Sequence, residues 1–130
     1  MFKIESDLIS LYDYVKENGG ATFHVESGQF YSGQGFGVAV AKNLEEVVDN
    51  FNTLGQEMFM IYLFDYIAIN SKLLGPTTED FYLGLWVEHN KLYIDVTQVV
   101  ATKRDALVLA KERNQLAIFD FNTFTTVRAA

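Results

Sequence analysis

Apolar and polar residues alternate over residues 81–97, which predicts a β-hairpin. The alternating runs 81–88 and 91–97 are joined by His89-Asn90, and this pair suits a tight turn because Asn tolerates a positive φ. A two-residue turn fixes the register, so we expect Trp86 to lie opposite Tyr93. One face of this hairpin is wholly apolar and is expected to join the core; it comprises Leu83, Leu85, Val87, Leu92, Ile94 and Val96.

The other face of the hairpin is amphipathic, and we call it the hairpin face. Its candidate site residues are Tyr82, Trp86, Tyr93, Asp95 and Thr97. Aromatic side chains with a few polar groups are typical of protein interfaces and ligand-binding surfaces. Two interpretations stay open. Another helix layer or residues 57–73 could cover this face within the monomer, or the face could be a homodimer interface or a ligand-binding surface.

An earlier hairpin is predicted over residues 21–32. Its strands are 21–26 and 29–32, with Ser27-Gly28 as a two-residue turn. A third strand at 38–41 is expected to complete a meander. A further strand at 116–121 is rich in apolar residues, which favours a position that is central in the sheet or covered on both faces.

Apolar side chains at helical spacing predict three amphipathic helices. Each begins at a residue type that caps helix N-termini, and each ends at a glycine or an asparagine. The predicted first residues are Ser6, Asn43 and Thr102, and the predicted ends are Gly19, Gly55 and Asn114. Asp105, three residues after Thr102, adds a weak capping box to the last helix.

Residues 57–73 are apolar on nearly all sides. Their length favours a buried helix, with a strand over 59–64 as the alternative. Together the elements predict a single α+β domain over residues 1–130. Its sheet is mostly antiparallel, with about six strands, and three or four helices lie largely on one face. The last helix could carry a crossover, because a strand precedes it and another follows it.

Charge is unevenly distributed along this acidic chain. The net charge is −7; residues 1–100 hold 14 acids and 5 bases, a net −9, whereas residues 101–130 hold 3 acids and 5 bases, a net +2. This balance argues against direct nucleic-acid binding, and it suggests an alternative function as an acidic mimic of nucleic acid that inhibits a host DNA-binding protein. A candidate basic patch on the last helix consists of Lys103, Arg104, Lys111 and Arg113.

The chain carries little that indicates catalysis. It has no cysteine, which removes thiolate nucleophiles and cysteine-ligated metals. The glycines at 33, 35 and 37 lead into a strand, whereas a dinucleotide-binding loop leads into a helix. We therefore predict no catalytic residue, no cofactor and no metal site. The enzymatic alternative is a small enzyme with carboxylate or histidine chemistry at Asp65, Asp95 or His24.

No membrane or secretory segment is expected. The N-terminus lacks a basic leader followed by an apolar stretch, and the most apolar run, residues 58–69, is too short to span a bilayer. These features predict a soluble cytoplasmic protein.

Residues 82–120 show a sequence resemblance. The stretches Tyr82-Leu-Gly-Leu-Trp-Val, Leu92-Tyr-Ile-Asp-Val-Thr-Gln-Val-Val and Ala110-Lys-Glu-Arg-Asn-Gln-Leu-Ala-Ile-Phe-Asp120 are similar to the C-terminal part of small uncharacterised proteins encoded by bacteria and their phages. Residues 18–23 also resemble that group. The resemblance implies a phage or prophage setting and an α+β fold, and it assigns no catalytic residue. The predicted function is non-catalytic binding by a homo-oligomer.

Overall fold

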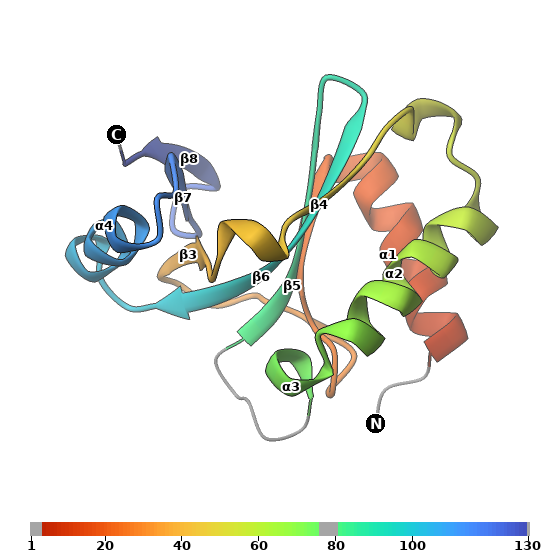
Figure 1. The fold of residues 1–130 in the computed structure, drawn as a ribbon, viewed down its shortest axis with the longest axis horizontal. Helices are drawn as coiled ribbons and strands as arrows, with labels where there is room; N and C mark the ends of the chain where they lie inside the picture. Colours follow the sequence, from red (N-terminus) through yellow and green to blue (C-terminus); the bar gives the residue numbers. More distant parts are fainter. Residues whose placement is uncertain (1–3, 76–80, 130) are drawn as a thin grey trace.

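A curled, antiparallel sheet with helices packed against it forms the α+β fold of this protein (Figure 1). The computed structural model describes residues 4–75 and 81–129. The helical elements in this part of the chain are α1 (Ile4–Asn18), η1 (Lys42–Leu44), η2 (Phe51–Thr53), α2 (Gln56–Ile69), α3 (Ser71–Leu74) and α4 (Lys103–Glu112). The strands are β1 (Gly20–His24), β2 (Gln29–Phe30), β3 (Phe36–Ala39), β4 (Glu46–Val48), β5 (Phe81–Glu88), β6 (Lys91–Val100), β7 (Ala117–Asp120) and β8 (Thr125–Arg128).

The long strand β6 is the centre of the sheet. The strands follow the order β2-β1-β5-β6-β3-β7-β8, and β4 also pairs with β6. Along the edge of β6 away from β5, residues 92–94 pair with β4 and residues 97–100 pair with β3. All these pairings are antiparallel. Because β3 pairs with both β6 and β7, these two strands run parallel to each other, and α4 connects them as a crossover.

The predicted β5–β6 hairpin is confirmed, including its register. His89 and Asn90 both have positive φ, 51° and 61°, as a tight turn with the twist of a hairpin requires. Every pair from Glu88 opposite Lys91 to Tyr82 opposite Thr97 is formed as expected. The turn residues therefore determine which side chains share each face of the hairpin.

The apolar face of this hairpin joins the main core. Leu83, Leu92, Ile94 and Val96 are fully buried beneath α1 and α2, which contribute, among others, Leu8, Leu11, Val15, Phe59 and Leu63. A second core cluster forms where α4 packs on β3 and β7; it contains Phe36, Val38, Ala106, Ala110 and Ile118. Strand alternation places Gln98 and Val100 on the same face of β6 as Val96, so α4 covers a continuation of the face that α1 and α2 cover.

The capping prediction for the last helix is confirmed. The Thr102 hydroxyl accepts a hydrogen bond from the Asp105 backbone N–H at 3.2 Å, and Asn114 adopts a positive φ of 56° just beyond the helix. The first helix begins at Ile4, so the predicted cap at Ser6 is wrong. Gly19 follows this helix with a φ of 80°, as predicted.

The helix predicted over residues 43–54 is wrong. This segment forms η1, β4 and η2 instead. Asn50 has a left-handed φ of 60°, which interrupts a helix, and β-branched Val47 and Val48 suit a strand. Pairing with β6 and burial of Val48 in the core stabilise β4 here and override the amphipathic spacing.

The predicted meander is also wrong. Strand β2 pairs only with β1, whereas β1 pairs with β5, and β3 pairs with β6 and β7. The hairpin over 21–32 does form, but a four-residue connection, 25–28, replaces the predicted two-residue turn. Strand β8 was not predicted. It makes β7 an interior strand between β3 and β8, but β7 lies next to the edge strand and only Ile118 within it is buried, so the predicted central or doubly covered position is wrong.

The segment 57–73 is helical, as predicted, but it is not buried on all sides. It forms α2 and α3, which join at Asn70. Phe59, Leu63 and Tyr66 face the core, while the opposite side of α2 faces away from the sheet. In Figure 1, α1 and α2 lie together on one side of β5 and β6.

Candidate functional site

The hairpin face lies on the side of the sheet that is opposite α1 and α2. Strand alternation places Trp86 and Tyr93 there, and register aligns Gly20, Trp86, Tyr93 and Val47 as one row across β1, β5, β6 and β4. Trp86 is 40% exposed and Val47 is 44% exposed, whereas Tyr93 is partly buried. This end of the face is therefore open and apolar.

Trp86 is held in place by one neighbour on β1 and one on its own strand β5. A Cβ atom at Gly20 would lie 3.6 Å from Cε3 of the indole, so the ring packs over this glycine. The indole Nε1 donates a hydrogen bond to Glu88 Oε2 at 3.2 Å. These contacts orient the indole on the sheet while leaving part of its surface accessible to a partner.

The other end of the hairpin face is covered by the monomer itself. The Tyr82 ring packs edge-on against His24 and Tyr31, with ring centroids 5.4 Å and 5.2 Å apart. Tyr31 also packs against Phe121 at 4.7 Å. The cover expected from residues 57–73 is not there, because α2 lies on the opposite side of the sheet. Aromatic side chains from the segment after β2 and the end of β7 cover it instead.

Asp95 and Thr97 form a polar pair between these two ends. The Thr97 hydroxyl donates to Asp95 Oδ1 at 2.6 Å, and both side chains occupy the space above Gly84, where any Cβ atom would overlap them. Burial raises the pKa of the Asp95 carboxyl to about 6; the hydrogen bond from Thr97 opposes this rise, and the Glu45 carboxylate adds to it. The pair is a tightly packed part of the sheet.

The predicted basic patch is divided by the structure. Lys103, Arg104 and Lys111 are exposed on α4. Arg113 is partly buried and holds α4 to the sheet, since its guanidinium donates to Gln98 Oε1 at 2.7 Å and to the Ala39 carbonyl at 3.5 Å. Three of the four cations are therefore available to an external partner, and the fourth has a structural role.

The three residues of the enzymatic alternative do not line one cavity. Asp65 is exposed on the outer side of α2. His24 and Asp95 lie on the opposite side of the sheet, on strands that β5 separates. His24 Nδ1 is 2.8 Å from the Ser27 hydroxyl and accepts from the Ser27 backbone N–H, so the connection 25–28 engages this nitrogen. Nowhere in residues 4–75 and 81–129 do three or more His, Cys, Asp or Glu side chains gather as a metal ion requires.

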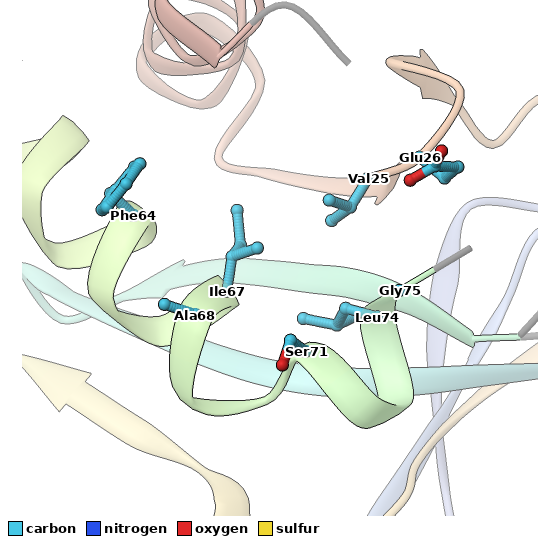
Figure 2. Close-up of a pocket in the computed structure, with 8 residues that line it drawn as sticks. All are labelled: Val25, Glu26, Phe64, Ile67, Ala68, Ser71, Leu74 and Gly75. Carbon is cyan, nitrogen blue, oxygen red and sulfur yellow. The ribbon is translucent and has the colours of Figure 1, made fainter. Parts of the chain in front are cut away.

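The outer side of α2 is a surface that the sequence did not single out. Its exposed residues include Met58, Ile61, Phe64 and Ile69. Next to it is a small hollow of about 280 Å³, which we call the α2–α3 hollow (Figure 2). Its lining residues are Val25, Glu26, Phe64, Ile67, Ala68, Ser71, Leu74 and Gly75. The apolar character of residues 57–73 was visible in the sequence, but which side stays exposed was not.

Comparison with known proteins identifies no similar protein. No protein-family model, curated protein or solved structure matches the chain. None of the helices within the described ranges is long and apolar enough to cross a membrane.

Proposed function

We propose that this protein is a non-catalytic interaction protein that works as a homo-oligomer. One observation carries the proposal: large apolar side chains are exposed on both sides of the sheet of a chain with net charge −7. Trp86 and Val47 are exposed on the hairpin face, and four apolar side chains of α2 are exposed on the other side. Exposed apolar surface that gathers in patches is typical of protein–protein contact.

The positions of the candidate catalytic groups favour binding over catalysis. General acid–base or nucleophilic chemistry needs its groups within hydrogen-bonding reach of one reacting atom. Asp65 lies on one side of the sheet, and His24 and Asp95 lie on the other. The hydrogen bonds of His24 and Asp95 are with Ser27 and Thr97 in their own neighbourhoods.

The proposal includes a cellular setting. The resemblance of residues 82–120 to small bacterial and phage proteins supports an accessory protein of a phage or prophage. We place it in the cytoplasm of the bacterial cell, where its acidic surface favours solubility. The exposed cations of α4, Lys103, Arg104 and Lys111, offer a secondary contact for an acidic host protein.

Native mass spectrometry of the purified protein over a concentration series tests this function. We expect more than one subunit and no additional small-molecule mass. The variant Trp86→Glu then asks whether the hairpin face joins the subunits. Circular dichroism of the variant separates loss of association from loss of the fold. A monomer that carries a co-purified small molecule would contradict the proposal and indicate a ligand-binding protein instead.

A further inference from the structure

The outer side of α2 exposes four large apolar side chains where a helix normally presents a mostly polar surface to water. Met58, Ile61, Phe64 and Ile69 are 45%, 51%, 48% and 81% exposed, and helical spacing places them along one side of the helix. With Glu57, Asp65 and Ala68 they form what we call the outer α2 face. By contrast, the exposed positions of α4 include Arg104, Asp105, Lys111 and Glu112. Large apolar side chains that gather on an exposed side of a helix are typical of a surface that a partner covers.

The outer α2 face continues into a recess. Phe64 and Ala68 belong both to this face and to the α2–α3 hollow, whose far wall is formed by Val25 beyond β1 and by Leu74 of α3 (Figure 2). The exposed surface thus combines a ridge of apolar side chains with an apolar depression beside it. The core of a stable interface is packed as densely as a protein interior, and a partner would reach that density here by filling the depression beside the ridge.

The exposed apolar area approaches the size that a homodimer needs. With roughly 200 Å² for a fully exposed large side chain, the four exposed apolar residues of α2 present roughly 450 Å². A stable interface buries about 800 Å² on each partner, and about 65% of a homodimer interface is apolar, which amounts to about 520 Å². The outer α2 face supplies most of this apolar area by itself.

We propose that the outer α2 face binds a second copy of this chain across a twofold axis. This inference rests on the homo-oligomer of the proposed function and assigns its interface. Isologous twofold dimers are the commonest oligomers, and their interfaces are more apolar than those of transient complexes. A lipid surface fits poorly, because helices that lie on membranes are rich in the basic residues Lys and Arg. The only charged residues of α2 are the acids Glu57 and Asp65.

The two acids give the dimer a distinctive salt dependence. A twofold interface brings Glu57 and Asp65 of both copies into one contact region, so the carboxylates repel each other across it. Raising the salt concentration screens this repulsion and lowers the dissociation constant of the dimer. A basic partner on the same face would show the opposite salt dependence, since screening weakens attraction between unlike charges.

The test compares charged substitutions at matched positions in the full-length protein by sedimentation equilibrium and native mass spectrometry. Ile61→Glu places a negative charge in the middle of the outer α2 face, and Ile69→Glu places one at its most exposed position. Val108→Glu is the matched control, because Val108 is 50% exposed on α4. Trp86→Glu reports on the hairpin face. Circular dichroism and thermal unfolding confirm that each variant keeps its fold.

We expect Ile61→Glu to raise the dimer dissociation constant by at least about 100-fold, because a twofold interface buries the unpaired charge twice. Ile69→Glu should also weaken the dimer, while Val108→Glu and Trp86→Glu leave it unchanged. A wild-type dimer that only Trp86→Glu dissociates would overturn this assignment and leave the proposed homo-oligomer intact. A wild-type protein that is monomeric at every concentration would overturn both. A dimer whose dissociation constant rises as salt is added would contradict the predicted repulsion between the Glu57 and Asp65 carboxylates of the two copies.

Discussion

The substitution Asp95→Asn should make the protein more stable at neutral pH. The Asp95 carboxyl is packed above Gly84, and within the described structure its hydrogen bond comes from the Thr97 hydroxyl. Burial raises its pKa to about 6 from an ordinary value of 3.8. The folded protein therefore holds this proton more tightly than the unfolded chain does. The stability that this group contributes is fully present below pH 3.8 and is lost as the pH rises through about 6.

The size of the effect follows from the two pKa values. A rise from 3.8 to about 6 corresponds to a cost of roughly 3 kcal/mol in the free energy of unfolding above pH 6. Asparagine removes the charge and keeps a carbonyl oxygen that accepts from Thr97. Burying the two N–H donors of its amide group costs about 1 kcal/mol at this packed position. We therefore expect a net gain of about 2 kcal/mol near pH 7.5 and no gain near pH 4.

Urea unfolding at a fixed protein concentration measures this gain, with far-ultraviolet circular dichroism as the signal. A net gain of about 2 kcal/mol moves the midpoint by about 1 M urea when the m-value is about 2 kcal/mol/M. Asp13→Asn is the matched control, since Asp13 is exposed on α1 and its substitution should leave the midpoint unchanged at both pH values. An Asp95→Asn variant that is less stable than the wild type near pH 7.5 would refute the reasoning.

Two further substitutions test local packing and capping. Gly84→Ala should lower the free energy of unfolding by about 1–3 kcal/mol, because its Cβ overlaps Asp95 and Thr97. Strand propensity alone predicts the opposite sign, so a stabilised variant in urea unfolding would contradict the packing account. Thr102→Ala removes the oxygen that accepts from the Asp105 N–H and should cost about 1 kcal/mol. An unchanged midpoint of thermal unfolding would show that this cap contributes nothing to the stability of the protein.

Sequence determined those elements whose conformation depends on neighbouring residues. The turn His89-Asn90 takes positive φ at both positions, and that local property fixes every cross-strand pair of the β5–β6 hairpin. The cap at Thr102 is likewise set within four residues. The membership of the hairpin face, with Trp86 and Tyr93 on one side of the hairpin, followed from alternation alone.

Elements that depend on distant partners were beyond the sequence. Residues 43–54 have helical spacing, yet the edge of β6 recruits Val47 and Val48 as the strand β4. Strand β3 was placed in a meander because nothing local shows that it lies between β6 and β7. Pairing between strands far apart in the chain is a property of the whole sheet, and it outweighs local preference where the two conflict.

The two candidate surfaces, the hairpin face and the outer α2 face, were likewise determined partly by the sequence and partly by the tertiary structure. The sequence supplied the residues of the hairpin face, but only the fold brought Tyr31 beside Tyr82 and so covered one end of that face. The sequence also showed that residues 57–73 are apolar on nearly all sides. Only the tertiary structure decided that Phe59 and Leu63 enter the core and that Ile61 does not, because one sheet can cover only one side of a helix.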